Sequence, residues 1–195
     1  MKNHYSFSEL VKTIYSLILT KIVMPQARLI RRPVYIRGRK SISGAKRLTL
    51  GRFCRFDLNG TEKTLYIGED CEFGDMTHIV AYGKVEIGNQ VLIASKCFIS
   101  DTNHGTYKGQ EQSNPDEPPK KRRLVIKPTK IGNNVWIGEN VVILAGAEIG
   151  DGCVIGAGSI ITKKIPKNTI VVGNEILIKS YNTKENKWEP LMKNA

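Results

Sequence analysis

The apolar residues of this chain recur every six positions. In the C-terminal half, isoleucine stands without a gap at positions 131, 137, 143, 149, 155 and 161. Upstream, the same spacing gives two further runs on either side of a two-residue slip at Gly83-Lys84: Ile67, Phe73 and Ile79, then Ile87, Ile93 and Ile99. A period of six does not fit the roughly 3.6-residue turn of an α-helix, but it is a multiple of two, so short strands can keep one face inward. The pattern predicts a β-solenoid in which each hexapeptide forms one short strand and a corner.

Small residues and glycines follow the same period. Four positions after the anchors come mostly small side chains, among them Cys71, Cys97 and Cys153, and we expect these thiols to fill the core. Glycine directly follows the anchor at positions 68, 74, 88, 132, 138, 150 and 156. We expect it there because corners often need a positive φ. The four cysteines form no C-x-x-C pair and no zinc-ligand spacing, so they do not predict a disulfide framework or a zinc site.

A helix is predicted over residues 6–24. Ser6 and Glu9 fit a capping box at its start, and Pro25 would end it. Apolar residues follow at helical spacing: Leu10, Ile14, Leu17 and Ile18. The segment is too short and too often interrupted by lysine to span a membrane. We favour a helix that packs against the end of the solenoid and covers its exposed edge, over one that lies on a membrane beside the basic cluster 28–40.

Charge and composition divide the chain into three parts. Residues 1–47 form a basic N-terminal segment, with eleven Lys and Arg against the single acid Glu9, and they supply most of the net charge of +12. Residues 48–180 are the expected β-helix domain, interrupted by a charged, Gly- and Pro-containing excursion loop at 105–130. Residues 181–195 are a polar C-terminal tail. A basic end of this kind can meet nucleic acid, an anionic membrane, a polyanionic substrate or a phosphate-bearing cofactor.

The motif Asp101-Thr-Asn-His-Gly105 lies where the chain leaves the repeat. An imidazole can take a proton from a hydroxyl at neutral pH, so His104 is the candidate general base. Asp101 or Asn103 could orient His104 or bind an acceptor, although Asn103 also occupies an inward repeat position and could simply satisfy a corner. A histidine in a loop is more often an ordinary surface residue, and only the position beside the excursion favours a catalytic role.

The runs Ile131–Ile143 and Ile149–Lys163 resemble the hexapeptide-repeat acyltransferases, and the resemblance covers about residues 50–180. It implies an all-β fold, a left-handed parallel β-helix, and the activity of an acetyl-CoA-dependent acetyltransferase. In the galactoside, maltose and streptogramin O-acetyltransferases, a histidine before an inserted loop is the general base, and His104 matches that position. The resemblance therefore implies a homotrimer in which an acceptor hydroxyl attacks acetyl-CoA directly, without an acyl-enzyme.

The resemblance also implies where acetyl-CoA binds. In the family the coenzyme lies in a groove between neighbouring subunits beside the C-terminal coils, and the matching positions are Trp136, Ala157, Thr162 and Lys163. Small residues, namely Ala145, Gly146 and Ala157, would let a thin pantetheine arm lie against the backbone, and Lys163 could meet a coenzyme phosphate. Related chains often carry Gly-x-Pro where this one has Gly173-Asn-Glu-Ile, so contacts to the adenine end are not carried over.

The expected acceptor is a sugar of a surface polysaccharide. The motif, the basic N-terminus and the charged loop together look most like acetyltransferases that modify capsule or lipopolysaccharide sugars. The galactoside and maltose members carry an asparagine about one coil before the histidine, where this chain has Asp75 and Met76, which argues against a simple disaccharide. We expect a cytoplasmic enzyme, and peripheral contact of its basic segment with the inner membrane surface stays open as an alternative that would suit such an acceptor.

Three alternatives stay open at this point. An N-acetyltransferase acting on a nucleotide-linked amino sugar would keep both the fold and the histidine. A non-catalytic module could use the basic end to bind nucleic acid, but that segment has no recognised motif or interleaved aromatic residues, so no nucleic-acid partner is expected. A zinc enzyme of the γ-class carbonic anhydrase type needs three converging histidines, and this chain has only His4, His78 and His104, so no metal is expected.

Overall fold

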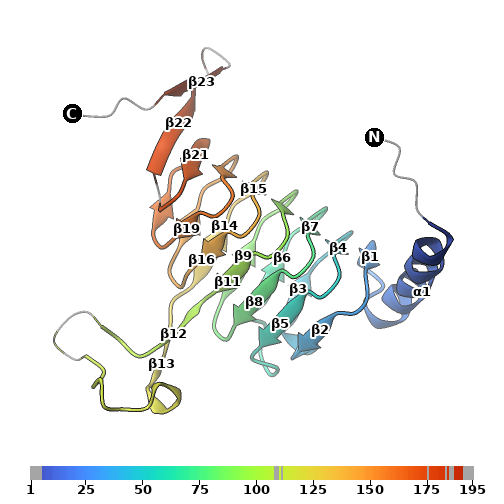
Figure 1. The fold of residues 1–195 in the computed structure, drawn as a ribbon, viewed down its shortest axis with the longest axis horizontal. Coiled ribbons are helices and arrows are strands. Elements are labelled where there is room, and N and C mark those ends of the chain that lie inside the picture. The colour runs from blue at the N-terminus through green and yellow to red at the C-terminus, as the bar shows by residue number, and fades with distance from the viewer. Residues whose placement is uncertain are drawn as a thin grey trace.

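The computed structural model describes residues 6–107, 110, 112–174, 176–182, 184 and 187–190. Short parallel strands stack into three sheets around one core, and the chain visits the sheets in turn, which confirms the predicted β-solenoid (Figure 1). The first sheet contains, in spatial order, β1 (Leu29–Ile30), β4 (Thr49–Leu50), β7 (Glu72–Phe73), β10 (Leu92–Ile93), β15 (Trp136–Ile137), β18 (Val154–Ile155) and β21 (Thr169–Val172). The second contains β2 (Tyr35–Arg37), β5 (Arg55–Leu58), β8 (His78–Ala81), β11 (Phe98–Ser100), β16 (Val142–Ile143) and β19 (Ile160–Ile161). The third contains β3 (Ile42–Gly44), β6 (Leu65–Ile67), β9 (Val85–Ile87), β14 (Thr129–Ile131), β17 (Glu148–Ile149) and β20 (Lys164–Ile165).

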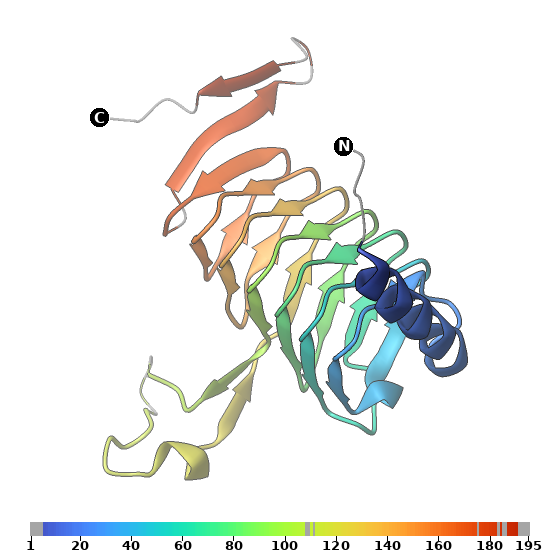
Figure 2. The same ribbon diagram turned by 45° about the vertical axis from the view of Figure 1, so that its right-hand side comes forward.

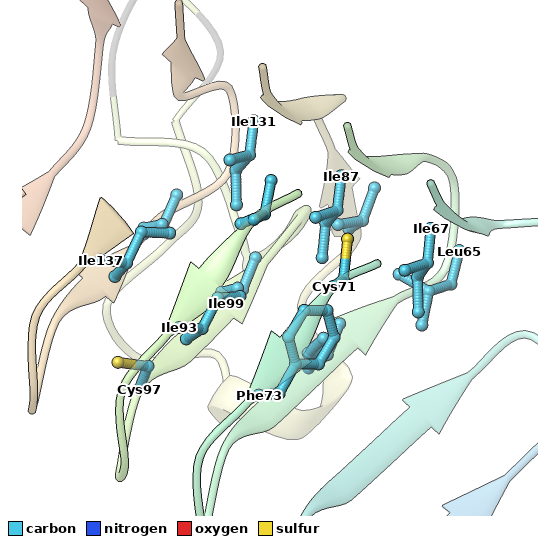
Figure 3. Close-up of a cluster of buried hydrophobic side chains, with 14 of the residues drawn as sticks. Leu65, Ile67, Cys71, Phe73, Ile87, Ile93, Cys97, Ile99, Ile131 and Ile137 are labelled. Atoms are coloured by element: carbon cyan, nitrogen blue, oxygen red, sulfur yellow. The ribbon is translucent and has the colours of Figure 1, made fainter. Parts of the chain in front are cut away.

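The residues at the six-residue period form the core. Every predicted anchor from Ile67 to Ile161 is buried, and anchors of successive coils stand in register, as Ile87, Ile131 and Ile149 do in the third sheet. Figure 3 shows such side chains pointing from different sheets into one interior, with the sulfur atoms of Cys71 and Cys97 among them. The predicted core position of Cys71, Cys97 and Cys153 is confirmed; Cys54 is buried as well, and all four thiols are free.

The glycines after the anchors serve the close stacking of coils, and the prediction that they supply positive φ is wrong. A Cβ on Gly88 would lie 2.7 Å from the carbonyl carbon of Gly132 in the next coil, a distance that real Cβ atoms do not adopt. Neither Gly88 nor Gly138 has a positive φ; that conformation falls two residues later, at Gln90 (56°) and Asn140 (59°). Glycine is required here because the neighbouring backbone leaves no room for a side chain.

Helix α1 (Phe7–Val23) begins at the predicted capping box. The hydroxyl of the N-cap Ser6 accepts the backbone N–H of Glu9, and the Glu9 carboxylate accepts the backbone N–H of Ser6. Figures 1 and 2 show it at the N-terminal end of the solenoid, outside β1. The helix covers this edge as expected, but its contacts with the edge are made by side-chain hydroxyl groups and not by its apolar face. The side chains of Ser16 and Thr20 are buried and accept the backbone N–H groups of Arg32 (3.3 Å) and Ile30 (2.9 Å), which satisfies donors on the edge strand and the residues after it.

The first coil begins within the segment 1–47 that the sequence analysis separates from the repeat. Strands β1, β2 and β3 pair in parallel with β4, β5 and β6. The physical reason is visible in the sequence, because Ile30, Ile36 and Ile42 already have the six-residue spacing, and all three are buried or packed against the core. None of the described residues forms a helix with the length and hydropathy to cross a bilayer.

Two elements depart from the solenoid. Between β11 and β14 the chain runs out as the antiparallel pair β12 (Thr102–His104) and β13 (Leu124–Ile126), with a short 3-10 helix η2 (Pro119–Lys121) in the excursion. A second 3-10 helix, η1 (Arg39–Ser41), precedes β3. At the C-terminus β22 (Ile176–Asn182) and β23 (Lys187–Pro190) extend the first sheet in antiparallel fashion, so the predicted tail 181–195 contributes a strand. Residues 191–195 lie outside the described residues.

Candidate functional site

Asp101 fixes the point at which the chain leaves the solenoid. Its side chain is fully buried. One carboxylate oxygen accepts the N–H of Tyr82 (3.1 Å), and the other accepts those of Gly83 (2.7 Å) and Lys84 (2.8 Å). Its backbone carbonyl accepts the N–H of Lys127 (2.8 Å), where the excursion returns. These contacts hold the corner that contains the two-residue slip and close the base of the excursion, so both carboxylate oxygens of Asp101 are engaged by backbone N–H groups of that corner.

The antiparallel hairpin β12–β13 carries the other two residues of the motif. Asn103 stands opposite Val125, and His104 stands opposite Leu124. Asn103 is exposed, so its predicted inward repeat position is wrong. The physical reason is that the antiparallel strand replaces the corner at which the repeat would have turned it inward. His104 is also exposed, in the last position of β12, and its imidazole is open to an approaching molecule.

A hydrogen-bond chain braces the excursion behind His104. The hydroxyl of Tyr107 donates to the backbone carbonyl of His104 (2.6 Å), and the guanidinium of Arg122 donates to the Tyr107 oxygen (2.9 Å). Arg122 also donates to the carbonyls of Glu117 (2.9 Å) and Pro115 (3.1 Å), and it lies over the Tyr107 ring at 5.9 Å. One arginine therefore joins three parts of the loop to the strand that presents the histidine.

A cavity of about 270 Å³ lies where the hairpin meets the corner between the second and third sheets. It brings together three of the predicted site residues, since Asn103 of the motif and the predicted coenzyme residues Ala145 and Thr162 all line it. The remaining lining residues come from the excursion and the adjacent corner: Gly105, Thr106, Tyr107, Val125, Lys127 and Leu144. His104 is not among the lining residues. Because consecutive strand residues face opposite sides, the hairpin presents Asn103 to this cavity and His104 to the other side.

The other predicted coenzyme residues fall into two groups. Gly146 and Lys163 lie exposed at the same corner as Ala145 and Thr162, and the aliphatic stem of Lys127 passes beside Gly146. Trp136 instead lies on the outer face of the first sheet, 55% exposed, and Ala157 lies at the corner that follows β18. The single chain therefore does not bring Trp136 and Ala157 to the cavity.

His78 has a structural environment away from this cavity. Its Nε2 lies 3.1 Å from a carboxylate oxygen of Asp57, and its ring packs edge-to-face with that of Phe98, with the ring centroids 5.2 Å apart. Burial acts to raise the pKa of Asp57, but hydrogen bonds from Arg55 and His78 outweigh it and hold that pKa below its ordinary value. His4 lies outside the described residues, and those residues contain no cluster of three or more His, Cys, Asp or Glu side chains able to hold a metal.

The buried thiols are poorly suited to act as nucleophiles. Burial raises the pKa of Cys54 to about 11, and it raises the pKa of Cys71, Cys97 and Cys153 as well. A thiol with a raised pKa holds little of the reactive thiolate near neutral pH.

Sequence reasoning missed Tyr107, Arg122 and Lys127 at this site. Tyr107 and Arg122 are fifteen residues apart in an irregular loop, where no spacing rule links them. Lys127 carried a weak signal, since it is the basic residue at which the excursion rejoins the repeat.

Comparison with known proteins assigns the chain to a family. The family model described as bacterial transferase hexapeptide (six repeats) matches residues 128–163. The chain is 36% identical over 191 residues to an Escherichia coli (strain K12) protein provisionally named lipopolysaccharide biosynthesis O-acetyl transferase WbbJ, an alignment that covers 97% of each chain.

Solved structures share the fold. A hexapeptide-repeat acetyltransferase of Vibrio cholerae O1 biovar eltor, solved with acetyl coenzyme A, is 25% identical and has a TM-score of 0.57 over 73% of each chain. A mutant of AntD, an N-acyltransferase of Bacillus cereus solved with dTDP-4-amino-4,6-dideoxyglucose and coenzyme A, has a TM-score of 0.68 at 22% identity, over 95% of this chain and 94% of that one. The chain therefore belongs to the bacterial hexapeptide-repeat transferases and is an acetyltransferase that uses acetyl-CoA as its acetyl donor.

Proposed function

We propose that the protein transfers acetyl from acetyl-CoA to a hydroxyl group of a sugar, in the synthesis of a capsule, O-antigen or other surface polysaccharide. The observation that carries this proposal is the cavity in which Asn103 of the hairpin meets Ala145 and Thr162 of the coil corner. It puts the motif that could handle an acceptor next to the small residues that could admit a pantetheine arm. The lipopolysaccharide-related name of the E. coli relative, which matches nearly the whole chain, supports the choice of a sugar acceptor.

His104 is the general base of the proposed reaction. Its neutral imidazole takes the proton from the acceptor hydroxyl while the hydroxyl oxygen attacks the thioester carbonyl carbon. The tetrahedral intermediate then collapses, the C–S bond breaks, and the imidazolium returns the proton to the departing coenzyme thiolate. Asn103 and His104 of one chain face opposite sides of β12, so the Asn103 that binds the acceptor belongs to the neighbouring copy in the shared site. Asp101, Tyr107 and Arg122 hold the hairpin in place. Lys163 meets a phosphate of the coenzyme.

The active form is a homotrimer in this proposal. His104 is exposed and lies outside the cavity, and Trp136 and Ala157 lie on other sides of the solenoid. A second copy packed along the solenoid can bring its own coil corner or sheet face to His104 and so complete a shared site. Since acetyl-CoA is a cytoplasmic metabolite, the enzyme works in the cytoplasm.

A nucleotide-linked amino sugar is the second candidate acceptor. The fold is shared with an N-acyltransferase solved with a dTDP-linked amino sugar and coenzyme A. The excursion also carries the exposed side chains of Lys120, Lys121 and Arg123, whose charge suits a sugar-nucleotide diphosphate as well as an anionic polysaccharide. An amine acceptor would use the same base and leave an amide product.

The test is acetyl transfer to a panel of sugars and nucleotide sugars, with the products located by mass spectrometry. The wild-type protein should form an acetyl ester, and His104→Ala should lower kcat by roughly 10²–10⁴-fold, as expected for loss of a general base. His78→Ala is the matched control, because it removes the other described histidine and should retain most of the activity. An amide product would replace the proposal with the second candidate, and unchanged kcat in His104→Ala would contradict the role of the base.

A further inference from the structure

Helix α1 turns its apolar face away from the protein. The exposed apolar side chains recur at helical spacing: Phe7 (82% exposed), Val11 (50%), Ile14 (49%), Ile18 (57%) and Ile22 (72%). Leu10 and Leu17 flank this stripe and are exposed as well. Ser16 and Thr20 lie on the opposite side and are buried against the first coil. This arrangement is the reverse of the usual one, in which the apolar face of a helix packs on the core.

Specific contacts fix the rotation of the helix. The hydroxyls of Thr20 and Ser16 accept backbone N–H groups of Ile30 and Arg32, so turning the apolar stripe inward would leave these donors without acceptors. The side chain of Lys21 donates to the carbonyl of Ala27 (2.9 Å) at the C-terminal end. The outward stripe is therefore a stable feature of the fold, and an exposed apolar patch of this kind marks an interaction surface.

The helix and the first coil that follows it are strongly basic. Residues 6–40 contain eight Lys and Arg and the single acid Glu9. Among the ion pairs of the described residues, only those of Arg28 with Asp70 and of Arg37 with Asp57 involve a basic residue of this segment. Of the others, Lys12 and Lys21 lie on the helix itself, and Arg39 donates to the carbonyl of Val23 at its C-terminal end (3.1 Å).

A cavity next to the helix combines the same two chemistries. It has a volume of about 260 Å³ and is lined by Met24, Ile30 and Val34 together with the guanidinium-bearing Arg32 and Arg39. Apolar groups and cations side by side match the two parts of a lipid, its acyl chain and its phosphate.

We propose that α1 docks the protein on an anionic membrane surface, with the Phe7–Ile22 stripe in the acyl boundary and the surrounding Lys and Arg on the lipid headgroups. Charge complementarity favours this occupant. Residues 1–47 carry a net charge of +10 (11 − 1) and the rest of the chain carries +2 (12 − 10), so the remainder of a second copy offers no excess of negative charge, whereas anionic lipids neutralise the basic segment. The proposal is independent of the acceptor and of the catalytic role of His104.

The test is sedimentation of the full chain with vesicles of phosphatidylcholine alone or with about one-third phosphatidylglycerol, a fraction chosen to give a clearly negative surface. The protein should bind the anionic vesicles, and the bound fraction should fall when NaCl is raised from about 0.1 M to 0.5 M, because salt screens the charges. Ile14→Ser/Ile18→Ser should weaken binding by roughly tenfold or more without any change in charge. Lys12→Gln/Lys40→Gln should weaken it by about fivefold per residue.

Leu92→Ser is the matched control, because Leu92 is also about half exposed (46%) but lies on the first sheet far along the chain from α1. This variant should bind like wild type. Circular dichroism and acetyl-CoA binding establish that each variant is folded. Equal vesicle binding by wild type and Ile14→Ser/Ile18→Ser would overturn the proposal. So would a loss of oligomeric mass in that variant by light scattering, because the stripe would then be a contact between copies of the chain.

Discussion

Replacing Asp101 with asparagine separates a positioning role from a chemical one. The carboxylate accepts three backbone N–H groups in a buried corner. In Asp101→Asn the amide nitrogen must take the place of one oxygen, so at least one buried N–H loses its acceptor and the remaining bonds lose their charge assistance. A buried unsatisfied donor costs about 1–3 kcal/mol, and with the weakened bonds we expect a loss of roughly 2–4 kcal/mol in the free energy of unfolding.

For a chain of this size that loss corresponds to a fall of roughly 4–16 °C in Tm, measurable by scanning calorimetry. The kcat for acetyl transfer should fall with the Tm, because Asp101 anchors the corner from which the hairpin carrying His104 leaves the solenoid. Asp116→Asn is the control, since Asp116 is exposed in the excursion and its substitution should leave Tm unchanged. If Asp101→Asn kept the wild-type Tm and lost activity alone, the carboxylate would act in the chemistry and the positioning role would be refuted.

Four further predictions follow from other contacts. Ile143→Ala removes a fully buried anchor and should cost about 2–5 kcal/mol by denaturant titration, while Ile160→Ala, at a half-exposed position, should cost much less; equal costs would contradict the assigned core. Because burial raises the pKa of Cys54 to about 11, no thiol should react with a disulfide reagent at pH 8 until the protein unfolds, and fast labelling of the native protein would contradict this. Asp57 has a lowered pKa, so its contribution to stability is present above the ordinary carboxyl pKa of 3.8 and is lost as the pH falls through its folded value; the Tm difference between wild type and Asp57→Asn should shrink there, and a difference that persists in acid would count against the ion pairs. Tyr107→Phe removes the hydroxyl that braces the His104 carbonyl but keeps the ring that lines the cavity, so it should lower kcat more than it changes the Kd for acetyl-CoA; wild-type kcat would show that the brace is dispensable.

The repeat could be predicted because one physical constraint acts at every sixth residue. Each anchor must fill the same narrow core, so Ile131 to Ile161 carry an unbroken signal. The same six-residue spacing occurs at Ile30, Ile36 and Ile42. Because these residues lie in a strongly basic segment, the sequence analysis assigned them to that segment and not to the repeat. The glycines were placed correctly but for the wrong reason, since the distance between coils is a tertiary property that a single coil does not reveal.

The site was predictable only in part. The interruption of the repeat pointed to the hairpin that carries His104, whereas Ala145 and Thr162 came from the family resemblance and from their small size; the structure brings these two to one cavity with Asn103. The burial of Asp101 and the exposure of Asn103 could not be predicted from the sequence. Both depend on the antiparallel hairpin, which has no periodic sequence pattern. The outward orientation of the apolar face of α1 could not be predicted either. The sequence shows an apolar stripe but does not show which face of the helix packs against the edge strand.

The most direct test of the central claim is the affinity for acetyl-CoA, measured by titration calorimetry, of wild type, Ala145→Trp and the control Lys167→Trp, whose substitution lies in an exposed turn. Ala145 lines the cavity of about 270 Å³ that also contains Asn103 and Thr162, so an indole there occupies the space assigned to the pantetheine arm. The proposed site predicts selective binding to wild type and the control, close to one acetyl-CoA per subunit, and a Kd at least roughly tenfold higher for Ala145→Trp. An unchanged Kd in a folded Ala145→Trp protein would place the coenzyme elsewhere and contradict the site.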